Sequence, residues 1–226
     1  MVIWLASGNK HKQQELAAIL AGHTVKLPAE AGITGFDPEE TGTSFAENAL
    51  IKAGALYSLL CSTTGGLRDN PVLADDSGLC VDALGGKPGI YSARYCGKNS
   101  WAAGGSFRAE PGAEKLKAQE RNSLLLEELN TLGDNSTHGG LRSCRFVCAM
   151  VLLFSPDRFY LVQETLEGEI VSSAAEIRGQ GGFGYDPIVY LPECGRTVAE
   201  LSEEEKNRSS HRGKAGRAIA KLLAGN

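Results

Sequence analysis

Two adjacent carboxylates, Asp75 and Asp76, are the residues of this sequence that are best suited to chemistry. They follow a short apolar run at 71–74, which is typical of a buried strand, and they precede a Ser-Gly pair that predicts a turn. Side chains alternate between the two faces of a strand, so we expect the two carboxylates to point in opposite directions. One could then face a ligand while the other anchors a loop. The alternative is an ordinary strand end whose carboxylates cap backbone N–H groups.

A turn between an apolar N-terminal run and a helical pattern is a candidate phosphate site. The turn occupies residues 7–9, and helical spacing follows over 10–21. A helix N-terminus presents backbone N–H groups and positive charge to an anion, and Lys10 and Lys12 add to that charge. The phosphate-binding pattern G-x-x-x-x-G-K-[ST] does not occur in the sequence. The alternative is a plain strand–turn–helix with Asn9 as its N-cap.

A glycine-rich stretch at 179–184 reads G-Q-G-G-F-G and matches the dinucleotide-binding pattern literally. That pattern requires a helix after the glycines, whereas residues 185–190 contain a proline and predict a strand. The stretch instead predicts a loop that presents Phe183, Tyr185 and Asp186 together. Aromatic faces beside a carboxylate suit a purine base. The alternative is aromatic core packing, with the aspartate in a turn.

Two further polar groups could contribute to a site. Residues 29–42 form a polar segment that contains Glu39 and Glu40, and a helix that carries Lys52 follows it. Near the C-terminus, His211 and Arg212 precede a final helix predicted over 215–224 and could donate hydrogen bonds to a base or a phosphate. The alternatives are a solvated acidic loop and a basic surface cluster.

The composition limits the classes of protein to consider. The chain has 226 residues, of which 42% are hydrophobic and 22% charged, as in a globular protein of one domain or two fused lobes. The net charge of −4 argues against a nucleic-acid partner, and no apolar run is long enough to span a membrane. The six scattered cysteines lack a C-x-x-C pair, which favours reduced thiols in a cytoplasmic protein and argues against zinc.

The elements that must position these residues alternate between strands and helices. We predict helices over 10–21, 44–60, 113–132 and 215–224, and strands over 2–6, 25–27, 71–74, 146–154 and 159–164. The last two strands flank a Pro-Asp turn and predict an antiparallel hairpin. The fold class is therefore α/β with a mixed sheet.

Six motifs in order make the sequence resemble the inosine triphosphate pyrophosphatase family, nearly from end to end. They are S-G-N-x-x-K at 7–12, E-E-T-G-x-x-F-x-E-N at 39–48, A-D-D-S-G at 74–78, L-G-G-x-P-G-I-Y-S-A-R at 84–94, G-G-F-G-Y-D-P at 181–187, and S-H-R-G at 210–213. The resemblance implies an α/β fold with a long mixed β-sheet flanked by helices and two lobes around a central cleft. It also implies that residues 1–226 form a single domain.

The resemblance further implies an activity. The family hydrolyses inosine, deoxyinosine and xanthosine triphosphates to the nucleoside monophosphate and pyrophosphate with Mg²⁺, and its members are typically homodimers. The expected partner is thus a small purine nucleoside triphosphate, with no nucleic acid and no membrane.

The family roles transfer to matching positions of this chain. Asp76 resembles the catalytic base and a Mg²⁺ ligand, and Glu39 resembles a second metal-side carboxylate. The triphosphate would be held by Ser7, Gly8, Asn9, Lys10, His11 and Lys12, and the nucleotide would also be contacted by Lys52 and Ser77. The base would be held by Phe183, Gly184, Tyr185 and Asp186, with Lys206, Ser210, His211 and Arg212 completing its pocket.

One segment departs from the family pattern, and two alternative functions stay open. Residues 100–117 are longer and richer in glycine and alanine than the family pattern, which bears on the geometry of the dimer. One alternative is a related nucleotide hydrolase with a different base preference. The other is a nucleotide-binding protein without catalysis.

Overall fold

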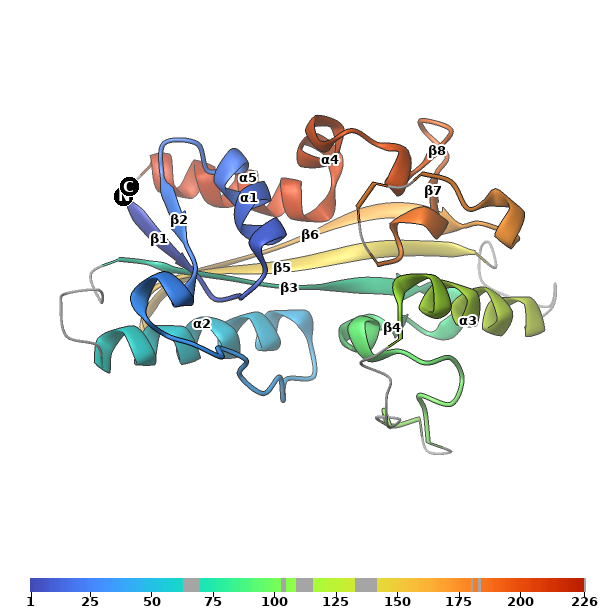
Figure 1. The fold of residues 1–226 in the computed structure, drawn as a ribbon, viewed down its shortest axis with the longest axis horizontal. Coiled ribbons are helices and arrows are strands. Elements are labelled where there is room, and N and C mark those ends of the chain that lie inside the picture. The colour runs from blue at the N-terminus through green and yellow to red at the C-terminus, as the bar shows by residue number, and fades with distance from the viewer. Residues whose placement is uncertain are drawn as a thin grey trace. The chain divides into compact units, whose positions relative to one another are not determined.

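A computed structural model gives the architecture of the chain (Figure 1). It describes residues 1–62, 70–102, 105–108, 116–132, 142–179, 181–182 and 184–225.

Within the described residues, eight strands form one mixed sheet. Their order is β2-β1-β3-β5-β6-β7-β8, with β4 paired to β3. The strands are β1 (Val2–Leu5), β2 (Thr24–Lys26), β3 (Val72–Val81), β4 (Lys87–Pro88), β5 (Ser143–Ser155), β6 (Arg158–Ile170), β7 (Val189–Leu191) and β8 (Arg196–Thr197). Strand β1 runs parallel to β2 and β3, whereas β6, β7 and β8 pair antiparallel. The predicted α/β class with a mixed sheet is confirmed.

Helices flank this sheet. They are α1 (Lys10–Ile19), α2 (Phe45–Ser62), α3 (Ala118–Thr131), α4 (Glu203–Ser209) and α5 (His211–Ala224). The contacts divide the chain into two compact units, each built from segments that are distant in sequence. The first unit comprises residues 1–77, 147–165 and 207–226, and the second comprises residues 78–146 and 166–206.

The first unit is a three-layer arrangement. Helices α1 and α5 cover one face of its strands and α2 covers the other (Figure 1). The core on the α1 and α5 side includes Leu16, Leu73, Met150 and Ile219, all fully buried. Burying both sheet faces explains why β1 and the start of β3 read as continuous apolar runs rather than alternating ones.

The second unit has its own core beneath α3. Buried side chains of α3, among them Leu125 and Leu129, join Leu79 of β3, Ile170 of β6 and Val189 of β7 in one cluster. A chain of short 3₁₀ turns connects these elements, including Gly89–Arg94 and Asp186–Ile188. Within this unit the Gly181 N–H donates to the Ala199 carbonyl, which holds that part of the glycine-rich stretch against the 3₁₀ turn Val198–Glu200.

Several boundaries predicted from the sequence were wrong. Strand β3 does not end at the two aspartates but continues through Ser77 and Gly78 to Val81. It continues because its backbone still pairs with another strand there, and its last residues pair with β4. Helix α5 starts at His211, since Ser210 accepts a hydrogen bond from the Gly213 N–H and caps it.

Two further boundaries differ because turn geometry prevailed over composition. Of the predicted strand over 185–190, residues 186–188 form a 3₁₀ turn and only the end belongs to β7. Helix α3 begins at residue 118, where Glu120 caps the Lys117 N–H, and residues 109–115 lie outside the described part. The predicted hairpin of β5 and β6 around Pro156 and Asp157 is confirmed.

Two glycines in regular elements are expected to respond oppositely to alanine. A Cβ on Gly168 of β6 would lie 2.8 Å from the Tyr190 carbonyl oxygen of β7, which is backbone and cannot turn away. We expect Gly168→Ala to lower the free energy of unfolding by about 1–3 kcal/mol. Gly54 of α2 has nothing within 4 Å of such a Cβ, so Gly54→Ala should raise it by about 0.5–1 kcal/mol. Urea titration of both variants measures this, and equal signs would contradict the β6–β7 register.

Candidate active site

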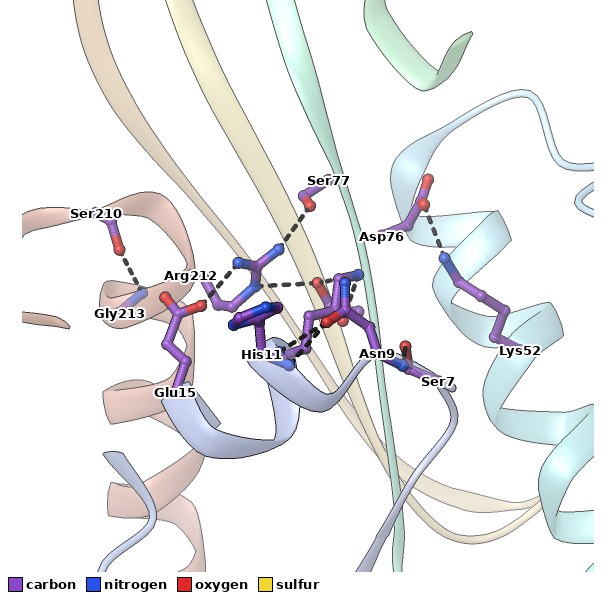
Figure 2. Close-up of polar contacts among 12 residues, drawn as sticks. Ser7, Asn9, His11, Glu15, Lys52, Asp76, Ser77, Ser210, Arg212 and Gly213 are labelled. Atoms are coloured by element: carbon purple, nitrogen blue, oxygen red, sulfur yellow. Dashed lines mark hydrogen bonds and ion pairs between the residues drawn. The ribbon is translucent and has the colours of Figure 1, made fainter. Parts of the chain in front are cut away.

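The two adjacent aspartates of β3 face opposite sides of the sheet, as predicted. Asp75 bonds to Lys12 of α1 and Arg212 of α5, whereas Asp76 bonds to Lys52 of α2. Figure 2 shows Arg212 and Asp76 on opposite sides of β3. The pleat of one strand therefore separates two charged groups that the sequence places side by side.

On the α1 and α5 side, Asp75 lies at the centre of a buried ion network. Its side chain is fully buried, and the Lys12 Nζ lies 3.0 Å from its carboxylate. The Arg212 guanidinium contacts Asp75 at 3.3 Å through Nε, Glu15 at 2.9 Å through Nη1 and the Ser77 Oγ at 3.2 Å through Nη2. Arg212 is 4% exposed, so its orientation is fixed by these three partners.

The electrostatics of this network depend on pairing. Burial alone would raise the pKa of Asp75, but Lys12 and Arg212 outweigh it and hold that pKa well below its usual range. Burial likewise opposes the charge of Arg212, yet Asp75 and Glu15 keep its pKa raised. Asp75 and Arg212 therefore favour their charged forms, and Arg212 is a rigid cation held against β3.

On the α2 side, Asp76 shares one ammonium group with a glutamate. The Lys52 Nζ lies 2.8 Å from the Asp76 Oδ1 and 2.9 Å from the Glu40 Oε1. The Asp76 Oδ2 has only a long hydrogen bond, 3.4 Å, from the Asn48 Nδ2. One oxygen of Asp76 is thus fixed by Lys52 and the other is weakly held.

The environment of Asp76 suits a proton acceptor. Burial raises the pKa of Asp76, although Lys52 acts against this. Burial also acts on Lys52, but Asp76 outweighs it and the pKa of the lysine is raised. A carboxylate with a raised pKa that still ionises is a better general base than an ordinary aspartate.

The turn before α1 has the geometry predicted for it. The Asn9 Oδ1 accepts hydrogen bonds from the N–H groups of His11 at 2.9 Å and Lys12 at 3.2 Å, so Asn9 is the N-cap. The Ser7 Oγ accepts a hydrogen bond from the Asn9 N–H. Gly8, Asn9, Lys10 and His11 are exposed at this helix terminus. The turn is therefore both a cap and an accessible cationic helix end, and phosphate binding there stays a prediction.

The C-terminal basic pair begins α5. Arg212 belongs to the Asp75 network, whereas burial, and then the nearby Arg212 charge, lower the pKa of His211 to about 3. His211 is therefore neutral at physiological pH and can donate through one ring nitrogen and accept through the other.

In the second unit, residues 184–186 are held by hydrogen bonds to three other segments. The Tyr185 hydroxyl donates to the Ser92 carbonyl at 2.9 Å, and the Lys206 Nζ bonds to the Asp186 Oδ2 at 2.8 Å. The Gly184 carbonyl accepts a hydrogen bond from Asn122. Phe183, predicted to stack on a base, lies outside the described residues.

Close packing explains one glycine of this stretch. A Cβ on Gly182 would lie 1.9 Å from the Asp186 carboxylate and 2.1 Å from the Lys206 ammonium, and its φ is +77°. A residue with a Cβ would therefore be strained at this φ and would displace the ends of the Asp186 and Lys206 side chains.

The carboxylates near Lys52 are the groups that could hold a cation. Among the described residues there is no cluster of three or more His, Cys, Asp or Glu side chains of the kind that binds a metal alone. Mg²⁺ commonly takes one or two carboxylates and completes its shell with water and substrate phosphates. Asp76 and Glu40, which already share one cation, fit that requirement. Glu39, the carboxylate predicted from the sequence, is exposed, and its role stays a prediction.

Sequence reasoning assigned no role in the site to Asp75, Glu15 or Asn48, and it named Glu40 only beside Glu39. Strand alternation already indicated that one of the paired aspartates would act as an anchor, and this residue is Asp75. No sequence signal distinguishes Glu40 from Glu39. Which of two adjacent glutamates meets Lys52 depends on the path of residues 37–43.

The fold and these groups define an α/β protein with a cationic helix end and a buried carboxylate on one central strand. The chain belongs to the Ham1 family, which matches residues 3–222. It is 46% identical to the dITP/XTP pyrophosphatase of Treponema denticola over 100% of both chains. It is 41% identical to the enzyme of that name from Thermus thermophilus over 97% of this chain and 90% of the other.

Solved structures agree with this assignment. A HAM1 protein from Coxiella burnetii matches with a TM-score of 0.78 and 34% identity over 100% of both chains. The family resemblance predicted from the six motifs is confirmed.

The Asp75 network yields a stability prediction. Asp75→Asn keeps the shape of the side chain but leaves Lys12 and Arg212 buried without their shared counter-charge. We expect the free energy of unfolding to fall by about 3–5 kcal/mol. Asp157→Asn, in the exposed turn after β5, is the matched control and should change it by less than about 0.5 kcal/mol. Equal unfolding midpoints in urea for the two variants would show that the network does not stabilise the fold.

Proposed function

We propose that this protein is a nucleoside triphosphate pyrophosphatase that hydrolyses non-standard purine nucleotides. Its substrates are inosine, deoxyinosine and xanthosine triphosphates, and its products are the nucleoside monophosphate and pyrophosphate. Full-length relatives named dITP/XTP pyrophosphatase support this activity. The observation that carries it to this chain is Asp76, a carboxylate of raised pKa that Lys52 and Asn48 hold in place.

The triphosphate is assigned to the cationic end of α1. Ser7, Gly8, Asn9, Lys10, His11 and Lys12 form that end, and Lys52 and Ser77 contact the same nucleotide from neighbouring elements. Lys12 is already oriented by Asp75, so it does not have to be ordered when the anion arrives. The geometry of Arg212 is likewise set in advance by Glu15, Asp75 and Ser77.

Mg²⁺ is the expected cofactor, and Asp76 with Glu40 or Glu39 would hold it. When bound, Mg²⁺ offsets phosphate charge and makes phosphorus more electrophilic. Lys52 sits between the Asp76 and Glu40 carboxylates and limits their mutual repulsion in the absence of other cations. The same lysine favours the ionised form of Asp76, which is the form that accepts a proton.

Asp76 acts as the general base in this scheme. Its Oδ1 is fixed by Lys52, and its weakly held Oδ2 takes the proton of the attacking water. The water oxygen forms a new bond to phosphorus while the bond to the bridging oxygen between the α- and β-phosphates breaks. General-base assistance of this kind contributes about 10²–10⁴-fold to the rate.

Base recognition is assigned to the glycine-rich stretch and the residues around it. Phe183, Gly184, Tyr185 and Asp186 would hold the base, with Lys206, Ser210, His211 and Arg212 completing its surroundings. Inosine and xanthosine carry a carbonyl at position 6 that accepts hydrogen bonds from such donors. Adenosine carries an amino group there, so donor would meet donor and a buried polar group would be left unpaired.

The proposed activity also carries expectations about the oligomeric state and the cellular compartment of the enzyme. We expect a homodimer in the cytoplasm, with no nucleic-acid or membrane partner. No helix among the described residues is long and apolar enough to cross a membrane. All six cysteines are free thiols, as a reducing compartment favours.

Pyrophosphate release from a panel of nucleoside triphosphates tests the activity. We expect rapid release from inosine and xanthosine triphosphates with Mg²⁺, little release from ATP, and none with a chelator present. Orthophosphate as the first product would contradict cleavage between the α- and β-phosphates. Turnover confined to modified pyrimidine nucleotides would instead favour a related hydrolase. Binding without any turnover would favour a nucleotide sensor.

Carboxamide substitutions test the roles of the three carboxylates. Asp76→Asn should fold normally and lose about 10²–10⁴-fold in kcat, because it can no longer take a proton. Glu40→Gln should raise the Mg²⁺ concentration needed for half-maximal rate more than Glu39→Gln does, because Glu40 shares Lys52 with Asp76. The two glutamate variants are matched controls for each other. Asp76→Asn turnover at the wild-type rate would exclude the proposed base.

A further inference from the structure

A polar side chain interrupts the apolar face of α3. The buried residues of this helix are Asn122, Leu125, Leu126 and Leu129, which lie at the i, i+3, i+4 and i+7 spacing of one stripe. The three leucines belong to the core of the second unit. Asn122 is 2% exposed and occupies a position where a fourth leucine would continue the stripe without burying a polar group.

The hydrogen bond made by Asn122 accounts for its presence. Its Nδ2 donates to the Gly184 carbonyl at 3.2 Å, across 62 positions of sequence. Because a carbonyl only accepts, the carboxamide must direct its nitrogen to Gly184, and its orientation is settled. The Oδ1 is buried, and within the described ranges no hydrogen-bond donor reaches it. The side chain thus makes one directed contact and otherwise gains little from its surroundings.

The Asn122–Gly184 hydrogen bond involves a residue that is assigned to base recognition. Gly184 has a φ of +66°, a left-handed conformation that glycine adopts readily, directly before Tyr185. The flanking residues have other anchors, since the Gly181 N–H bonds to the Ala199 carbonyl at 3.2 Å and Tyr185 bonds to Ser92. Asn122 anchors Gly184 itself through its carbonyl.

We infer that Asn122 is a positioning residue for base recognition. By holding the Gly184 carbonyl it fixes the backbone that leads into Tyr185 and Asp186, and so it sets how well the base of the nucleotide is selected. Asn122 does not touch the reacting atoms in this scheme. The inference rests on the proposed function, because it assigns a role within base selection by that enzyme.

The test compares Asn122→Leu with the wild-type chain. Leucine preserves the size of the side chain and the apolar stripe but removes the donor to Gly184. We expect the thermal midpoint to be retained, the KM for inosine triphosphate to rise by about three- to tenfold, and kcat to change by less than about twofold. The preference for inosine over guanosine triphosphate should fall along with the rise in KM. Asn122→Ala, which removes the same donor without adding bulk, should give the same pattern.

Two variants of α3 serve as controls. Asn130→Leu changes an exposed asparagine of the same helix whose partner is Arg142, and it should leave KM and base preference unchanged. Leu125→Ala damages the same core stripe and should lower the thermal midpoint without altering base preference.

The outcomes separate the inference from the proposed function. Pyrophosphate release by the wild-type chain with an unaltered KM and base preference in both folded Asn122 variants would overturn the inference alone. A lower thermal midpoint without a change in base preference in both Asn122 variants, as expected for Leu125→Ala, would also overturn the inference. Failure of the wild-type chain to release pyrophosphate from any purine substrate would overturn the proposed function, and the role of Asn122 with it.

Discussion

The buried charge of Asp75 is the constraint on which the first unit depends. A carboxylate without exposure is very costly unless cations reach it, and here they come from two helices that start 201 residues apart in the chain. Satisfying this charge brings the N-termini of α1 and α5 to the same strand. Lys12, which is assigned to the triphosphate, and Arg212, which is assigned to the surroundings of the base, are both oriented by that pairing before any ligand binds.

The pleat of β3 lets one short sequence serve two purposes. Asp75 is neutralised on one face and has a lowered pKa, which suits an anchor. Its neighbour Asp76 keeps a raised pKa on the other face, which suits a base. The difference does not lie in the residue type or in the local sequence. It arises because α1 and α5 supply two cations to one face, while α2 supplies a single lysine that is shared with Glu40.

In the second unit, the main structural requirement is to restrain a glycine-rich segment. Glycines allow the backbone to pass over the Asp186–Lys206 pair, but they also remove the side chains that would fix it. Hydrogen bonds from Asn122, Tyr185 and Lys206 supply the missing restraint. A polar residue in the apolar stripe of α3 is thus understandable as part of a loop support, not as a defect of the core.

The sequence by itself determined the fold class and the family, because these depend on local patterns, and it predicted the residues of the candidate site. Apolar runs, turn residues and six ordered motifs carry that information, and strand alternation alone predicted that Asp75 and Asp76 would diverge. Only the tertiary structure decided where β3 ends, that Glu40 rather than Glu39 meets Lys52, and that Asp75 joins Lys12 to Arg212. The contact of Asn122 is likewise visible only in the tertiary structure, since its partner Gly184 is distant in sequence. Such choices depend on which distant segments come into contact and on the resulting burial and charge, and no local pattern encodes either.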